Sequence, residues 1–257
     1  MNRNDIDLYK QFVKTIFKMR YKGSLLGFFW VLFKPFFMFI ILFIVFSSVS
    51  GTVGDLTSKQ YAVYLLSGLV IFTFFNEGIV WGLGSIIERA DLIVKINFKR
   101  EIVVISALTM ALINFAINLL IVAVIGIVLQ IQFSFIGVAY ILLIGLTMFL
   151  GMYGIAFFSS IWMVYLRDLA HIMELVLQLM FYASAVFFPI EMIPEKYQFI
   201  VRYNPIAIFI QSVREALTHQ NIVNLNFVLG SLLVSILLVL IGSVYFKKKI
   251  LRVAEHF

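Results

Sequence analysis

Long apolar segments separated by short charged ones dominate the chain. Residues 35–54 contain no Asp, Glu, Lys or Arg, and residues 102–166 are 65 consecutive positions without a formal charge. As one helix the second run would be about 98 Å long, roughly three times the thickness of the hydrocarbon core of a bilayer. It must therefore fold back, and we expect the turn at the polar stretch from Gln130 to Ser134. The runs are continuous rather than alternating, which favours helices over a β-barrel.

A span requires roughly 20 mostly apolar residues, and the charge-free runs provide six such segments. The predicted spans are residues 28–50, 61–86, 103–129, 136–162, 169–190 and 225–246. Fifteen Lys and Arg residues lie at the span ends that share the side of the N-terminus, and four lie on the opposite side. Because basic residues are retained in the cytoplasm, both termini are predicted to be cytoplasmic. The predicted fold class is an all-α integral membrane protein with one transmembrane domain over residues 1–257.

Composition supports this fold class. Apolar residues make up 63% of the chain, charged residues 13%, and the mean hydropathy is +1.05. Soluble domains are about 45–50% apolar and about 25% charged, so most of this surface must face lipid. The chain has no cysteine, which excludes disulfide bonds and cysteine-ligated metals. We attribute the net charge of +7 to membrane topology and expect no binding to nucleic acid. The first 22 residues lack a signal-peptide core, so the first span is expected to be retained as an anchor.

Residues 5–22 are predicted to contain an amphipathic helix, over residues 5–20, on the cytoplasmic face. Apolar side chains beginning with Leu8 and Phe12 recur at helical spacing, and lysines repeat every four residues on another face. Such a helix suits the headgroup layer of a membrane. It could serve as a plain anchor before the first span or contact a cytoplasmic partner as well.

The longest internal cytoplasmic loop, residues 86–101, combines both signs of charge with an apolar cluster that includes Leu92, Ile93, Val94 and Ile96. A solvated loop needs no such cluster, whereas a docking element must fill the cleft of a partner and surround the contact with charge pairs. We therefore favour docking over a plain loop. The candidate docking residues are Arg89, Asp91, Lys95, Lys99, Arg100 and Glu101.

Residues 190–224 are too long for a structureless external connection. Asn204 followed by Pro205 is typical of a helix start, with an N-cap and proline at the first helical position. Pro194 opens a shorter helix before it. We expect two short helices at, or re-entrant into, the outer leaflet, acting either as a gate or as a passive cap. The candidate gate residues are Pro189, Pro194, Asn204 and Pro205.

Sequence signatures of catalysis are missing. The chain contains no phosphate loop of the form G-x-x-x-x-G-K-[ST], no HExxH and no G-x-S-x-G, so we expect neither ATP hydrolysis nor a catalytic or metal site. The charges predicted within or near the spans include Lys34, Glu77 and Glu174. Lys34 either snorkels towards the cytoplasm or lines a pore and meets an anionic substrate. The two acids could relay ions. Alternatively, Glu77 pairs inside the bundle or reaches the outer interface, and Glu174 faces a water-filled cytoplasmic cavity.

Aromatic residues reach 16% and concentrate in the first, second and fifth spans. Aromatic rings can stack on the apolar faces of sugars, so an aromatic-lined path would let a glycan slide. For any single Phe, packing or lipid contact is the simpler interpretation. The candidate channel residues are Trp30, Phe33, Phe36, Phe37, Phe74, Trp81 and Tyr182.

Several short motifs together resemble a known family. They are Arg20-Tyr21-Lys22-Gly23-Ser24 through Trp30, Lys34-Pro35, Asn97-Phe98-Lys99-Arg100-Glu101, Arg167-Asp168-Leu169, Phe181-Tyr182-Ala183-Ser184, Ile193-Pro194-Glu195-Lys196-Tyr197 and Tyr203-Asn204-Pro205-Ile206. In this order they resemble the transmembrane permease subunits of polysaccharide ABC exporters, which export O-antigen, capsule or teichoic acid. Lys99 and Ala185 stand where the family commonly has proline.

The resemblance implies a six-span permease in the bacterial inner membrane, paired as a homodimer and driven by two separate ATPase subunits. Those subunits would bind ATP and Mg, and this chain would carry no cofactor. The substrate would be a lipid-linked polysaccharide moving through a channel lined by spans one, two and five of both copies. Residues 86–101 would be the coupling helix and residues 5–22 the interface helix. The alternatives are a permease for drugs or lipids, an ion-coupled secondary transporter and a membrane glycosyltransferase.

Overall fold

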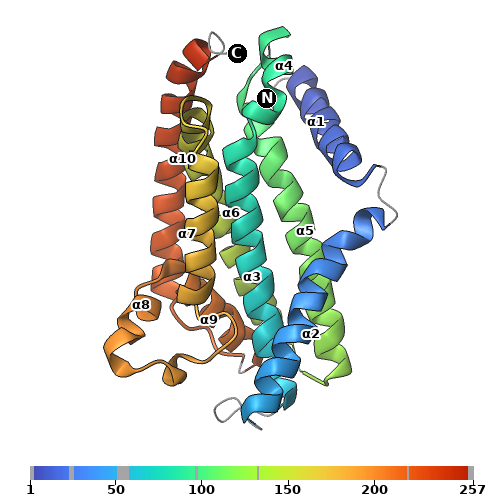
Figure 1. The fold of residues 1–257 in the computed structure, drawn as a ribbon, viewed down its shortest axis with the longest axis vertical. Helices are drawn as coiled ribbons and strands as arrows, with labels where there is room; N and C mark the ends of the chain where they lie inside the picture. Colours follow the sequence, from blue (N-terminus) through green and yellow to red (C-terminus); the bar gives the residue numbers. More distant parts are fainter. Residues whose placement is uncertain are drawn as a thin grey trace.

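The computed structural model describes residues 3–22, 26–50, 58–95, 98–131, 133–218 and 220–253, and every regular element within them is helical. The long helices form an upright bundle (Figure 1). They are α2 (Trp30–Ser50), α3 (Ser58–Gly84), α5 (Glu101–Val128), α6 (Phe135–Tyr165), α7 (Leu169–Ala183) and α10 (Leu225–Val253). The shorter elements are α1 (Arg3–Tyr21), η1 (Gly27–Phe29), η2 (Ile87–Arg89), α4 (Ala90–Lys95), η3 (Ile190–Met192), η4 (Glu195–Tyr197), α8 (Gln198–Arg202) and α9 (Pro205–Thr218).

The elements divide between the two ends of the bundle. The first turn of α1 and the last turn of α10 lie at the same end as α4, which we call the α4 end (Figure 1). Helices α8 and α9 lie at the opposite end, which we call the α9 end. The α4 end therefore holds the two segments predicted to be cytoplasmic, and the α9 end holds the segment predicted to be external.

Four helices, namely α3, α5, α6 and α10, are long and apolar enough to cross a membrane. Two shorter apolar helices, Trp30–Phe46 within α2 and Leu169–Ala183, occupy the positions predicted for spans one and five. Only 17% of the most apolar stretch of α10 is buried, and Leu233 and Ile241 on it are more than half exposed. Exposing so large an apolar surface to water would be unfavourable, so these faces contact lipid or another protein. The chain is thus a multi-pass membrane protein.

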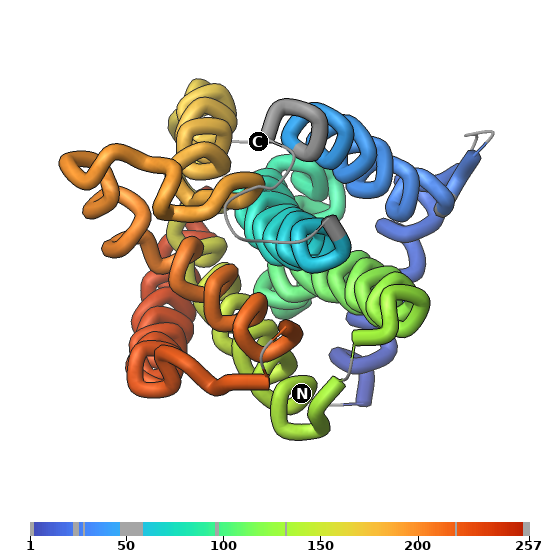
Figure 2. Tube along the Cα trace, turned by 90° about the horizontal axis from the view of Figure 1, so that it is seen from below, coloured from blue at the N-terminus to red at the C-terminus, as the bar shows by residue number. Residues whose placement is uncertain are grey.

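Helix α3 is the central element. It packs against α2, α5, α6, α7 and α9, which surround it when the bundle is seen from the α9 end (Figure 2). Close packing against α6 depends on glycine, because a Cβ on Gly82 would lie 2.7 Å from the Cβ of Ala156. A Cβ on Gly78 would overlap the side chain of Met152 one turn earlier. The two glycines four residues apart therefore form a small-residue contact of the kind common between membrane helices.

The predicted fold-back after the third span is confirmed. Helix α5 ends at Val128 and α6 begins at Phe135, with Ser134 as its N-cap. Gln130 adopts a left-handed conformation with φ of 62°, which reverses the chain. The polar residues of this turn therefore divide the long charge-free run, which is too long for one span, into two helices.

The predicted end of span five is wrong, and one helix extends beyond its predicted span. Span five was predicted to reach residue 190, but α7 ends at Ala183, although the sequence stays apolar beyond it. Ala185 is left-handed, with φ of 48°, and the Asn204 side chain donates to the last helical carbonyl, that of Ala183, at 3.1 Å. Tertiary contacts therefore stop the helix. The last span was predicted to end at residue 246, and α10 continues to Val253 as an extension at the α4 end.

The short helices between spans five and six form as predicted. Asn204 accepts a hydrogen bond from the backbone N–H of Ile206 at 2.9 Å, and α9 begins at Pro205. One face of α9 is apolar and buried, with Ile210 and Val213 at most 1% exposed. This helix therefore packs against the bundle, in contact with α3 and α6.

Arg214 holds α9 to its neighbours. Its guanidinium donates to the carbonyls of Tyr64, Ala185 and Val186 at 3.1, 3.1 and 2.6 Å, and it lies 3.4 Å from the centroid of the Tyr64 ring. We call this arrangement the Arg214 clamp. Burial lowers the pKa of Arg214 to about 10, so the group stays cationic at neutral pH. The clamp joins α9 to α3 and to the turn after α7.

We expect Gly68→Ala to destabilise the protein by about 1–3 kcal/mol, the cost of disturbing a buried charged hydrogen-bond network. A Cβ on Gly68 would lie 2.6 Å from Nη2 of Arg214 and 2.8 Å from the carbonyl oxygen of Val186. Thermal unfolding of the purified protein in detergent measures the effect. The matched control is Gly230→Ala in α10, where a Cβ would meet nothing within 4 Å. Equal melting temperatures for the two variants would contradict this role of Gly68, since alanine is otherwise the better helix former.

Candidate functional site

The amphipathic helix α1 is attached along α5 at the α4 end. Phe12 is buried and its ring lies 5.5 Å from that of Phe98, just before α5. The Tyr9 hydroxyl is hydrogen-bonded to that of Thr109 at 2.9 Å. The lysines predicted for the opposite face are exposed. The structure thus confirms an amphipathic helix, with its apolar side against the bundle.

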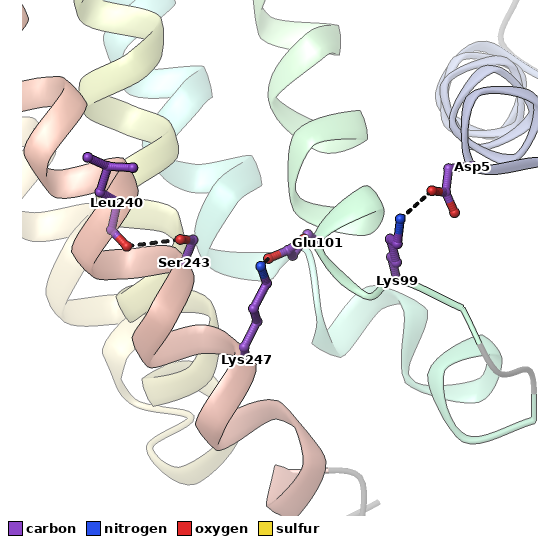
Figure 3. Close-up of polar contacts among 6 residues, drawn as sticks. All are labelled: Asp5, Lys99, Glu101, Leu240, Ser243 and Lys247. Atoms are coloured by element: carbon purple, nitrogen blue, oxygen red, sulfur yellow. Dashed lines mark hydrogen bonds and ion pairs between the residues drawn. The ribbon is translucent and has the colours of Figure 1, made fainter. Parts of the chain in front are cut away.

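Two ion pairs link three elements at this end (Figure 3). Lys99 lies 2.5 Å from Asp5 of α1, and Glu101 at the start of α5 lies 3.4 Å from Lys247 of α10. Exposed ion pairs contribute only about 0.2–1 kcal/mol each. They therefore orient α1 and α10 relative to the segment that follows α4 and add little to stability.

The predicted docking residues fall into three groups. Asp91 and Lys95 are exposed on α4, whereas Lys99 and Glu101 are engaged in the ion pairs within the chain. Arg89 is half-buried, and its Nη1 donates to the sulfur of Met19 at 3.4 Å. Arg100 is half-buried too, and its Nε has no hydrogen-bond partner among the described residues.

The apolar cluster of the same loop is also divided. Leu92 and Val94 are exposed, but Ile93 is 1% exposed and belongs to the main core of the bundle. The prediction that Ile93 enters the cleft of a partner is therefore wrong; it anchors α4 instead. Ile96 and Asn97 lie outside the described residues. The exposed surface of α4 thus consists of two apolar side chains between two opposite charges.

The predicted channel residues do not share one environment. Phe74 is 1% exposed and stacks on Phe115 of α5 at 4.2 Å between centroids, so the prediction that it lines a channel is wrong. Trp81 is half-buried beneath the guanidinium of Arg20, 3.6 Å from the ring centroid. Phe33 is half-buried and lies 5.8 Å from the ring of Phe37.

The remaining four channel candidates are exposed on two helices that flank α3. Trp30, Phe36 and Phe37 lie on α2, and Tyr182 lies on α7. Helices α2 and α7 stand on the same face of the bundle, one on each side of α3 (Figures 1 and 2). Phe46 of α2 meets Phe187 after α7 at 5.0 Å, so aromatic packing connects the two flanks at the α9 end. We call this surface the aromatic face.

The charges predicted within the first two spans lie close to one another. Glu77 of α3 accepts a hydrogen bond from Asn114 of α5 at 2.8 Å and interacts electrostatically with Arg20 and Lys34. Lys34 is exposed on α2. The arrangement favours internal pairing of Glu77 over an ion relay. Glu174 lies apart from this group, exposed on α7.

The predicted gate residues stand at helix starts. Pro189, Pro194 and Asn204 precede η3, η4 and α9 as their N-cap residues, and Pro205 is the first residue of α9. Sequence reasoning missed Arg214, which it counted only as an external cation. The position of Arg214 in the sequence could have indicated its burial, because it lies four residues after Ile210 and one after Val213, at the margin of the apolar face. An arginine at such a position must either snorkel or be satisfied internally.

Comparison with known proteins agrees with this architecture. Residues 7–218 match the ABC-2 type transporter family. The chain is 29% identical over 238 residues to an O-antigen export system permease protein RfbA of Klebsiella pneumoniae, covering 93% of this chain and 90% of that protein. It is 24% identical over 260 residues to the RfbA protein of Myxococcus xanthus, covering 95% of this chain and 92% of the relative. The family match includes both the α4 loop and the helices of the α9 end, and the chain therefore belongs to the ABC-2 type transporter family.

Proposed function

We propose that this chain is the membrane-spanning permease subunit of an ATP-driven exporter of lipid-linked polysaccharide. The observation that carries the proposal is similarity to O-antigen export permeases over nine-tenths of both chains. The whole of residues 1–257 acts as one transmembrane domain of six spans, with both termini in the cytoplasm of a bacterium and the spans in its inner membrane. The chain itself performs no catalysis.

The energy comes from two separate ATPase subunits, which bind ATP and Mg and dock at the α4 end. The exposed Leu92 and Val94, with Asp91 and Lys95 beside them, have the composition of a small interface core with a charged rim. Ile93 anchors α4 in the core, so a displacement of α4 is transmitted to the bundle rather than absorbed in a loose loop. The ion pairs of Lys99 and Glu101 extend the same movement to α1 and α10.

The channel forms between two copies of the chain, with the aromatic face of each copy turned towards the other. Supporting this placement, α2 and α7, which carry these exposed rings, stand on one side of the bundle and flank the central α3. Exposed rings offer sugar rings a flat apolar surface without strong hydrogen bonds, which suits a polymer that must slide. The helices of the α9 end form the outer gate, and Lys34 on α2 places a cation at the edge of this face.

Charge reversal on α4 is expected to block transport without preventing insertion. In Lys95→Glu or Asp91→Lys, the charge that borders the docking contact repels its counterpart on the ATPase, so ATP-dependent export falls at least tenfold. Export in inverted membrane vesicles containing both subunits measures this, and co-purification of the ATPase reports docking. Lys59→Glu makes the same change at the exposed start of α3, at the opposite end of the molecule, and should export normally. Wild-type export by both α4 variants would refute docking at α4.

Removing rings from the aromatic face is expected to slow export while leaving the protein amount unchanged. Trp30→Ala and Phe37→Ala remove exposed rings, so folding loses little, whereas polymer movement loses a stacking surface. Phe74→Ala provides the contrast, because truncating a buried Phe costs about 3–5 kcal/mol and should lower the yield. Phe135→Ala removes an exposed ring at the start of α6, away from the aromatic face. If Trp30→Ala behaves like Phe135→Ala in vesicle export, the aromatic face does not guide the polymer.

A further inference from the structure

A polar cavity of about 470 Å³ opens at the α9 end, and we call it the outer cavity. Its walls come from the start of α3, the segment between α7 and η3, and helices α8 and α9. Its volume is within the usual range of small-molecule sites, about 300–1,000 Å³. Several segments distant in sequence thus meet around one space of ligand size.

The walls of the outer cavity carry a balanced set of polar groups. Two guanidiniums, Arg202 and Arg214, are matched by two carboxylates, Glu191 and Glu215. Side-chain amides accompany them, from Gln60, Gln211 and Asn224. A site for an anion would not normally include two carboxylates, and a site for a cation would not include two arginines. The set instead offers donors and acceptors together, which matches hydroxyl groups, because each hydroxyl can both donate and accept.

Parts of this set are available to a ligand. In the part of the chain that the structure describes, Glu191 and Gln211 are exposed and their side chains make no hydrogen bond. Arg214 is 7% exposed and held by three carbonyls, so it is a fixed wall rather than a mobile side chain. A rigid wall with a few polar side chains that lack partners is suited to binding, because few side chains lose conformational freedom when a ligand binds.

The other side of α9 has a different character. A groove of about 550 Å³ is lined there by residues such as Phe209, Phe227 and Leu238, without a charged side chain among them. An acyl chain would enter that apolar groove rather than the polar outer cavity. Helix α9 thus separates an environment suited to lipid tails from one suited to hydroxyl groups.

We infer that the outer cavity binds a neutral, hydroxyl-rich ligand, namely a sugar unit of the exported polysaccharide. The inference rests on the proposed function, which brings a glycan to the α9 end. The Glu191 carboxylate and the Gln211 amide bind the ring hydroxyls, and Ala207 and Ile190 provide apolar contact for the C–H faces of the ring. Such a site holds a segment of polymer beside the gate helices once it has emerged.

Binding of the purified chain to lipid-free polysaccharide tests the inference. The polysaccharide is released by mild acid from cells of the strain that carries this gene, and the chain is embedded in nanodiscs. Saturation-transfer NMR titration gives Kd for the wild type and for Glu191→Gln, Gln211→Ala and the double variant. Loss of one charged hydrogen bond raises Kd about tenfold, since about 1.4 kcal/mol corresponds to that factor. Glu195→Gln is the matched control, because Glu195 is exposed on the neighbouring η4 but does not line the cavity.

The expected result is binding by wild type and Glu195→Gln, and weaker binding by the cavity variants. No binding by the wild type, equal Kd in all variants, or displacement of the polysaccharide by inorganic pyrophosphate would each overturn the inference. Deleting the gene separates this outcome from failure of the proposed function. If deletion removes polysaccharide from the cell surface while the purified chain does not bind it, only the sugar site is refuted. If surface polysaccharide persists after deletion, the export function itself is refuted.

Discussion

The close approach of neighbouring helices to α3 is the constraint on which both ends of the molecule depend. Glycine makes this approach possible at three positions along α3: Gly68 lies beneath Arg214, and Gly78 and Gly82 lie against α6. In a membrane, helices gain little from leaving lipid for one another, so van der Waals fit and satisfied polar groups must hold them together. The Arg214 clamp illustrates the second requirement, because three backbone carbonyls surround the buried cation. A larger residue at position 68 would push that cation from its acceptors and loosen α9.

The same helix gives the protein a mechanical route from one end to the other. Helix α3 contacts α9 at one end and leads through η2 directly into α4 at the other. It contains no proline, and Ser85 continues its hydrogen bonding by donating its hydroxyl to the carbonyl of Gly82 at 2.8 Å. Under the proposed function, a movement imposed on α4 would reach the α9 end through a packed helix rather than through a flexible linker. This is the type of contiguous element through which two distant sites can be coupled.

The sequence predicted those features that depend on local chemistry. Charge-free runs located the apolar helices, the polar stretch at Gln130 located the α5–α6 turn, and Asn204 with Pro205 located the start of α9. Features that depend on contacts between distant segments were not predicted from the sequence. The end of α7 depends on a side chain 21 residues later, and the burial of Arg214 depends on a missing Cβ in α3. The burial of Phe74 and the exposure of Phe36 were not predicted either. A helix that is apolar all round has no periodicity that distinguishes its buried face from its exposed face.

The two helices that flank α3 on the aromatic face have the least regular backbones in the bundle. Pro35 lies inside α2 and has no N–H to donate to the carbonyl four residues earlier, that of Val31. Helix α7 stops at Ala183 after 15 residues, and the chain continues through the left-handed Ala185 without regular structure as far as η3. Non-helical backbone at membrane depth is tolerated only when it is covered by protein or lines a water-filled space. After α7 this cover comes from the chain itself, because Arg214 donates to the carbonyls of Ala185 and Val186, and the hydroxyls of Tyr61 and Tyr64 donate to those of Phe187 and Phe188.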